Sequence, residues 1–95
     1  MSATFFGKYR GIVTDNVDPL QIGRIRARVP DVFGTKASGW ALPCVPCKLP
    51  GKAGSALPKI GDTVWMEFER GDPDFPIWSG CYYSSAAATP PSLRK

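Results

Sequence analysis

The sequence contains no histidine, and this absence removes the commonest ways of building an active site. Without histidine the chain has no usual acid–base shuttle and no Ser-His or Cys-His pair for nucleophilic catalysis. The glycines match no phosphate-binding loop of the Walker or dinucleotide type. Glu67 and Glu69 share one face of a predicted strand, and no cleft is indicated around them. We therefore predict a protein that is not an enzyme and that uses no cofactor.

Cysteine is also scarce, with three residues at positions 44, 47 and 81. An odd number argues against the disulfide framework of a small secreted protein. Cys44 and Cys47 have CxxC spacing, but a closed zinc site needs four ligands and Cys81 supplies the only further thiol. A redox pair usually sits at a helix N-terminus, whereas this pair follows a proline-interrupted strand. We expect buried or semi-buried structural cysteines and no intrachain metal site. A redox pair and a metal shared between chains remain open.

Long apolar runs are missing as well. The first six residues have neither the basic start nor the apolar stretch of a signal peptide, and no segment is long enough to cross a bilayer. We expect a protein made in a cytoplasm, without a membrane-spanning segment.

The 95 residues contain ten prolines and ten glycines, and these residues interrupt every stretch that could show the period of a long helix. Such frequent interruption is typical of an all-β domain with short strands. A chain of this length forms one domain with a small core. Association with other chains would therefore add to its stability.

The clearest strand pattern surrounds Val64, Met66 and Phe68, which alternate with more polar positions. Turn-forming residues follow at 70–74, and a second β-prone run extends over 75–83. The pattern predicts a β-hairpin with a long acidic connection.

Three earlier strands are predicted at 8–15, 24–29 and 40–45. Gly11 in the first of them suggests a bulge or a sharp bend. The second alternates strictly, with Ile25, Ala27 and Val29 pointing inward and the arginines between them pointing outward. We expect a polar loop over 31–38.

Five short strands match the five-stranded OB-fold barrel, in which a helix normally separates the third and fourth strands. Here a long Pro/Gly-rich loop over 46–60 takes the place of that helix. An SH3-like barrel or an open sheet would also fit the periodicity. We expect the folded domain to span 1–83 and residues 84–95 to form a flexible tail or linker.

The charges are unevenly distributed along the chain. Residues 1–60 carry nine basic and three acidic side chains, whereas residues 61–80 carry one basic and five acidic side chains. Some OB folds bind single-stranded nucleic acid with aromatic side chains in a basic groove. The row of outward residues Arg24, Arg26 and Arg28 would suit that role. The acidic hairpin argues against it, so nucleic acid binding is our alternative hypothesis.

Trp65 points away from the predicted core, because it alternates with inward residues of its strand. An outward indole is stabilised by burial against a partner or a sister subunit, or by cover from the 46–60 loop. Lys8 and Arg10 of the first strand would face Glu67 or Glu69 across the sheet. The candidate interface residues are Arg24, Arg26, Arg28, Trp65, Glu67, Glu69 and Trp78.

Three motifs occur in order: DPLQIGRIRARVPDVFG, SGWALPCVP and GDTVWMEFERGDPDFPIWSG. Together they resemble the OB domain of phage baseplate assembly protein V, which is shared with the VgrG spike proteins of type VI secretion and with related contractile injection particles. The resemblance covers about residues 5–83. It implies a homotrimeric OB collar at the base of the central spike, seated on a baseplate hub protein and joined to a spike or spike-tip protein.

The chain departs from this pattern after Tyr83, where neither a repeat-rich β-helix nor a lysozyme-like domain follows. It could therefore be the collar alone, with the spike on another polypeptide or on a further part of the same protein. The resemblance implies a virion-type structural protein, made in a bacterial cytoplasm and assembled into a tail baseplate or injection particle. Phage, tailocin and secretion machine all remain open.

Overall fold

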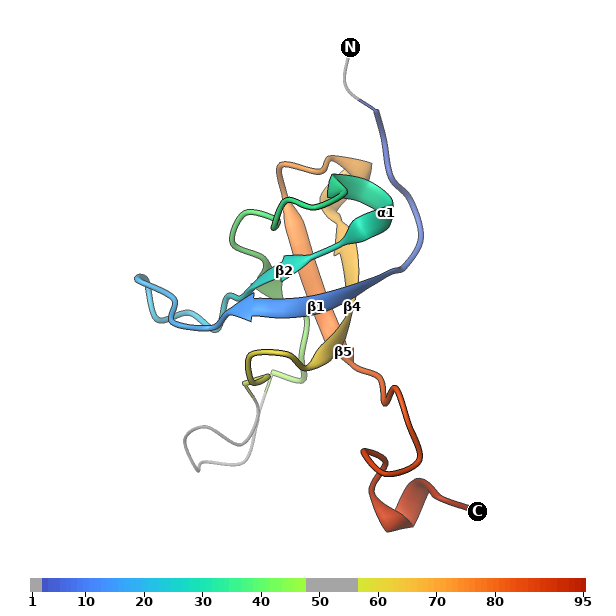
Figure 1. Ribbon diagram of the computed structural model, residues 1–95. Helices are drawn as coiled ribbons and strands as arrows, with labels where there is room; N and C mark the ends of the chain where they lie inside the picture. Colours follow the sequence, from blue (N-terminus) through green and yellow to red (C-terminus); the bar gives the residue numbers. More distant parts are fainter. Residues whose placement is uncertain (1–2, 48–56) are drawn as a thin grey trace.

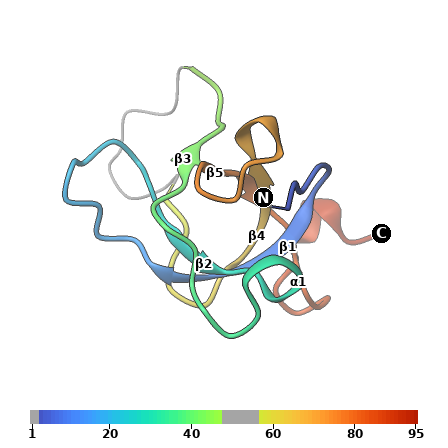
Figure 2. The same cartoon turned by 90° about the horizontal axis from the view of Figure 1, so that it is seen from above.

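The computed structural model of the protein describes residues 3–47 and 57–95, and within them a five-stranded sheet curls on itself (Figures 1 and 2). The elements in chain order are β1 (Tyr9–Asp15), β2 (Arg26–Arg28), α1 (Pro30–Phe33), β3 (Leu42–Pro43), β4 (Thr63–Phe68), the 3-10 turn η1 (Glu69–Gly71), β5 (Pro76–Cys81) and the 3-10 turn η2 (Pro91–Leu93).

The strand order is β2-β1-β4-β5-β3, and every pairing is antiparallel except that of β3 with β5. Two isolated bridges, Ile25 with Ala41 and Arg28 with Ala37, join the β2 edge to the segment around β3. They bring the two edges of the sheet together, as closure of a barrel requires. The prediction of a five-stranded OB fold is confirmed, with β1 lying between β2 and β4, and an open sheet is not formed.

The core lies inside this curl and is built from alternate positions of the strands. As predicted, β4 turns Val64, Met66 and Phe68 inward, and the 25–29 segment turns in every second residue. The buried apolar side chains are Val13, Ile25, Ala27, Val29, Ala41, Val64, Met66, Phe68 and Trp78. Phe68 also meets the rings of Phe5, Tyr9 and Phe33, with centroids 5.8–6.2 Å away.

Gly11 has a different role from the one predicted. The pairing of β1 with β4 runs regularly through Gly11 opposite Val64, and the register shift of β1 lies between Val13 and Asp15 instead. A Cβ on Gly11 would lie 2.8 Å from Cγ of the buried Met66. The glycine therefore permits the close approach of β1 to the core, and the predicted bulge at this position is wrong.

The predicted polar loop over 31–38 contains a short helix. Pro30 occupies the first turn of α1, where its missing N–H costs no hydrogen bond. The amides of Phe33 and Gly34 donate to the carbonyls of Val29 and Pro30. Sequence reasoning missed this turn because four residues are too few for a helical period. Val32 and Phe33 of α1 pack against the core cluster.

The third strand is shorter than the predicted 40–45 segment, since β3 comprises two residues. Residues 48–56 of the predicted 46–60 loop lie outside the described part of the chain. In the tail, η2 gives residues 91–93 a local turn, and the role of the tail as a linker stays a prediction. Over residues 3–47 and 57–95, no helix combines the length and apolar character that crossing a membrane requires.

Substituting Gly11 by alanine should destabilise the domain. The new methyl group would overlap Met66, which has no exposed surface and cannot move aside freely, so the free energy of unfolding should fall by about 1–3 kcal/mol. Urea denaturation followed by tryptophan fluorescence measures this change. Gly39→Ala is the matched control, because a Cβ there meets nothing within 4 Å. A Gly11→Ala protein as stable as the control would contradict the packing role.

Candidate interaction site

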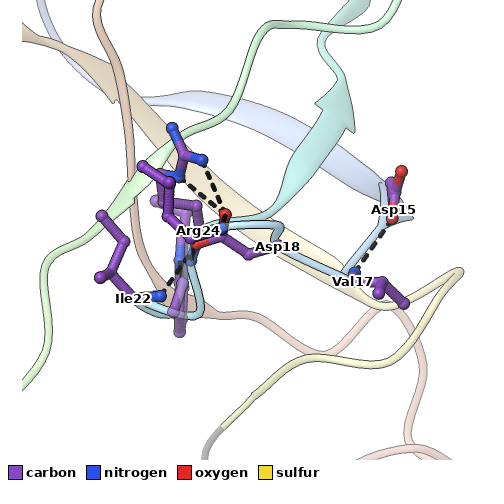
Figure 3. Close-up of polar contacts among 8 residues, drawn as sticks. Asp15, Val17, Asp18, Ile22 and Arg24 are labelled. Carbon is purple, nitrogen blue, oxygen red and sulfur yellow. Dashed lines mark hydrogen bonds and ion pairs between the residues drawn. The ribbon is translucent and has the colours of Figure 1, made fainter.

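The connection from β1 to β2, residues 16–25, is organised by one carboxylate, Asp18 (Figure 3). Asp18 accepts hydrogen bonds from the backbone amides of Leu20 (2.9 Å), Ile22 (3.0 Å) and Arg24 (3.2 Å). The Arg24 side chain adds Nε and Nη2 donors at 3.0 and 2.7 Å from Oδ1. We call this segment the Asp18 loop.

The local sequence explains this geometry. Pro19 has no N–H, so the first amide available to the carboxylate is that of Leu20. Gln21 (φ 54°) and Gly23 (φ 82°) adopt left-handed conformations that turn the later amides back toward Asp18. Glycine suits its position because a Cβ would meet Pro43 at 3.2 Å. The base of the loop is also tied to the core, since the Trp78 indole N–H donates to the Gly23 carbonyl at 2.9 Å.

Burial and hydrogen bonding act on Asp18 in opposite directions. The Asp18 carboxyl is almost fully buried, which disfavours its charge, but the Arg24 guanidinium and the three backbone amides hold its pKa well below the ordinary range. The same contact raises the pKa of Arg24. The loop is therefore built around a carboxylate that stays ionised at every physiological pH.

The Asp18 loop holds large apolar side chains in solvent. Val17, Leu20 and Ile22 are 76%, 63% and 50% exposed. The backbone amides that fix Leu20 and Ile22 are the ones that donate to Asp18. A loop whose backbone is already ordered loses less conformational entropy when it binds a partner. The arrangement is suited to protein contact.

The three arginines of the 24–29 segment do not share the same contacts. The guanidinium carbons of Arg24 and Arg26 lie 5.5 and 5.9 Å from the centre of the Trp40 ring. Arg26 also donates from Nε to the Ser38 carbonyl, while Arg28 is exposed and lies opposite Ile12. Two of the three predicted interface arginines thus cluster on one tryptophan, and the third lies apart on the β1–β2 surface.

Trp65 points outward, as predicted, and is half-buried. Its ring lies against Tyr82 just beyond β5, with centroids 4.8 Å apart. Arg10 of β1 covers both rings, at 5.7 Å from Trp65 and 5.1 Å from Tyr82. Within the described residues, the contacts that cover Trp65 therefore come from Arg10 of β1 and from Tyr82 just beyond β5. Residues 48–56 of the loop predicted to cover it lie outside the described part of the chain.

Glu67 lies beside Trp65 on the same outward face and pairs with Lys8 across the sheet, with Nζ and Oε1 3.1 Å apart. The predicted cross-strand pair is confirmed for these two residues. The Lys8 ammonium, followed by Ser79, lowers the pKa of Glu67. Both side chains are substantially exposed, so the pair contributes about 0.2–1 kcal/mol to stability. Glu69 lies outside this pair, at the start of η1, and is exposed.

Trp78 does not lie on the surface. Its side chain is 4% exposed and belongs to the core cluster, while Ile77 beside it is partly exposed. The expectation that Trp78 joins an interface is wrong for this domain, because β5 directs alternate residues inward and Trp78 falls on the inward set.

All three cysteines are free and exposed, so the expectation of buried or semi-buried structural cysteines is wrong for Cys44 and Cys47, while the Cys81 sulfur is partly covered. Partial burial of its sulfur, helped by the charge of Asp62, raises the pKa of the Cys81 thiol. Among residues 3–47 and 57–95, no three cysteine, aspartate or glutamate side chains are grouped closely enough to hold a metal ion.

The cysteine assignment can be tested by thiol labelling. Cys44, Cys47 and Cys81 should all react with Ellman's reagent in the folded protein, and Cys81 should react most slowly at neutral pH because its raised pKa leaves less thiolate. A Cys81→Ser variant should lose the slow phase alone. A thiol that reacts after denaturation but not before would contradict its exposure.

The sequence analysis did not identify the carboxylate clamp of Asp18. The available signal was an Asp-Pro pair followed six residues after the aspartate by an arginine. That spacing does not by itself show which charges meet, since Arg26 and Arg28 are also near in sequence.

Removing the Asp18 carboxylate should loosen the loop. In Asp18→Ala, amide exchange of Leu20, Ile22 and Arg24 should accelerate on the order of tenfold or more, because three donors and Arg24 lose their acceptor. Asp15→Ala is the matched control, since Asp15 accepts a bond from the Val17 amide. Hydrogen exchange read by NMR measures the effect, and equal exchange in both variants would contradict the clamp.

The clamp also sets a pH dependence. Asp18 has a lower pKa in the folded state than the value of about 3.9 for an unfolded chain. Its stabilisation is therefore complete above about pH 4 and is lost as the pH falls further. The difference in thermal midpoint between the wild type and Asp18→Ala should accordingly shrink when the pH is lowered below 4.

Comparison with known proteins agrees with this architecture. Residues 9–83 match the family model described as the type VI secretion system/phage-baseplate injector OB domain. Over 57 residues, or 60% of the chain, the sequence is 40% identical to the type VI secretion system spike protein VgrG4b of Pseudomonas aeruginosa, and the match spans 6% of that protein. The family description places such domains in the injector of a type VI secretion system or a phage baseplate. The chain belongs to the family of type VI secretion and phage-baseplate injector OB domains.

Proposed function

We propose that this protein is a non-enzymatic collar at the base of a central spike, and that three copies assemble around the spike axis. The collar would join a baseplate hub protein on one side to a spike or spike-tip protein on the other. In this proposal the protein is made in the bacterial cytoplasm and acts within a tail baseplate or injection particle. Family membership supports the structural role.

The observation that carries the proposal is the Asp18 loop. A carboxylate clamp that orders a loop while leaving Val17, Leu20 and Ile22 in water suits a surface that another protein covers. We assign this surface to the hub contact. The outward residues Arg24, Arg26, Arg28, Trp65, Glu67 and Glu69 are proposed for further contacts with the hub or with sister copies.

The path of the chain suits a connecting element. The segment before β1 runs beside η1, where the Phe5 amide donates to the Gly71 carbonyl. The segment after β5 leaves at the other end of the barrel (Figure 1). Residues 84–95 would therefore lead away from the η1 end and toward the spike.

The contacts of the arginines weaken the nucleic acid hypothesis. Arg24 is paired with Asp18 at 2.7 Å, and its guanidinium lies over Trp40 together with that of Arg26. A charge that is already compensated releases few counterions from a phosphate backbone. A filter-binding titration over a salt series tests the alternative. Micromolar affinity for single-stranded DNA that falls steeply with salt would favour it over the collar.

The trimer itself is tested by light scattering. At high concentration the protein should reach three times its chain mass of 10.3 kDa, or should form a complex that contains three copies of the chain once the hub protein is added. A strict monomer under both conditions would overturn the collar.

The hub contact is tested by a matched pair of surface variants. Leu20→Ser should weaken binding to the hub protein by about tenfold or more, because Leu20 is 63% exposed on the clamped loop. Leu93→Ser removes an equally exposed leucine (64%) from the tail and should leave hub binding unchanged. Binding is measured by calorimetry on samples with equal thermal midpoints. Equal hub affinity in the two variants would contradict the assignment of the loop.

A further inference from the structure

We propose that sister copies meet through two different surfaces, with the acidic β4–β5 turn of one copy seated on the basic aromatic face of the next. The inference rests on the proposed trimer and names the surfaces that would form it. A closed three-fold ring needs such a pair, because each copy offers one surface to the copy before it and another to the copy after it.

The first surface is the outer face of β1, β2 and β4, defined here by Arg10, Arg28, Trp65 and Tyr82 and called the basic aromatic face. Arg10 is spread over the two rings at 5.1 and 5.7 Å. Arg28 lies opposite Ile12, two residues along β1 from Arg10. Both arginines are exposed. Among residues 3–47 and 57–95, the ion pairs are Lys8 with Glu67 and Asp18 with Arg24, so neither Arg10 nor Arg28 is matched by a carboxylate there.

The second surface is the connection between β4 and β5, residues 69–75, called the acidic turn. It carries three carboxylates, Glu69, Asp72 and Asp74, against one basic side chain, Arg70. Beside them Phe75 is 59% exposed. The turn lies at the end of the barrel next to the segment before β1 (Figure 1), beyond the end of β4.

The shape of the acidic turn is fixed by its own backbone. The amide of Asp72 donates to the Glu69 carbonyl, and that of Phe75 to the Asp72 carbonyl, at 3.0 Å each. Oδ1 of Asp72 accepts from the Asp74 amide at 2.9 Å. Gly71 (φ 76°) lies under the Phe6 ring, which leaves no room for a Cβ. The backbone of the turn is therefore held in one arrangement, from which the exposed side chains of Glu69, Asp74 and Phe75 project.

The two surfaces are opposite in charge, and both carry aromatic rings. One offers guanidinium groups on aromatic rings, and the other offers carboxylates around an exposed phenyl ring. Aromatic and arginine side chains are typical of the energetic centres of interfaces. Within one copy the described ion pairs do not join the two surfaces. This leaves both free for a second copy.

Charge reversal tests the pairing. Arg10→Glu and Asp74→Lys should each weaken trimer formation by about tenfold or more, since each places like charges together. The double variant carries both changes in one chain and should regain trimer formation, because every interface in the ring then has its charges exchanged. Lys36→Glu, an exposed reversal elsewhere on the surface, is the control and should assemble like the wild type. Sedimentation equilibrium at low salt gives the association constants.

The outcomes separate this inference from the collar proposal. A monomeric wild type, with or without hub, overturns the collar and this inference with it. A trimeric wild type whose assembly is unchanged by Arg10→Glu and Asp74→Lys overturns the inference alone. Loss of assembly in both single variants without recovery in the double variant also overturns the pairing. Circular dichroism and thermal midpoints are compared first, to show that each variant is folded. If Arg10→Glu is unfolded, Arg28→Glu takes its place, and if Asp74→Lys is unfolded, Glu69→Lys takes its place.

Discussion

Close packing between the inward faces of β1 and β4 sets the geometry of this barrel. Met66 fills the space beneath Gly11, and the backbone of β1 approaches it at a distance that a side chain on residue 11 would prevent. Because side chains alternate along a strand, fixing Met66 inward also fixes Trp65 and Glu67 outward. The core and the proposed interaction surface are therefore consequences of one register.

The Asp18 loop extends this order beyond the sheet. Its base is joined to the core by the Trp78 N–H at the Gly23 carbonyl, and its interior is held by a buried carboxylate and Arg24. A buried ion pair is weak evidence for stability, since desolvation opposes the attraction, but it specifies one geometry when its hydrogen bonds are satisfied. Here the result is an ordered loop that carries exposed apolar side chains, which suits a structural member of an injection apparatus.

Much of the fold could be predicted from the sequence. The alternation in 24–29 and around Val64, Met66 and Phe68 located two strands with their correct faces, and the strand count led to the OB barrel. Short elements were harder. The four residues of α1 and the two of β3 are too few to show a periodic signal. The formation of β3 also depends on its pairing with Ile77 and Trp78 of β5, which lie far away in the chain.

The sequence by itself determined the inward and outward sets of the long strands, the turns at Asp18-Pro19 and Gly71, and the lack of histidine chemistry, since each depends on residue type and local spacing. Tertiary structure alone decided which arginine meets Asp18, that Trp78 is core while Trp65 stays outside under Arg10, and that the cysteines are exposed. The contact of Asp18 with Arg24 depends on the path of the loop between β1 and β2. The positions of Trp65 and Trp78 depend on the curl of the sheet, which brings together residues far apart in the chain and is not visible in any local pattern.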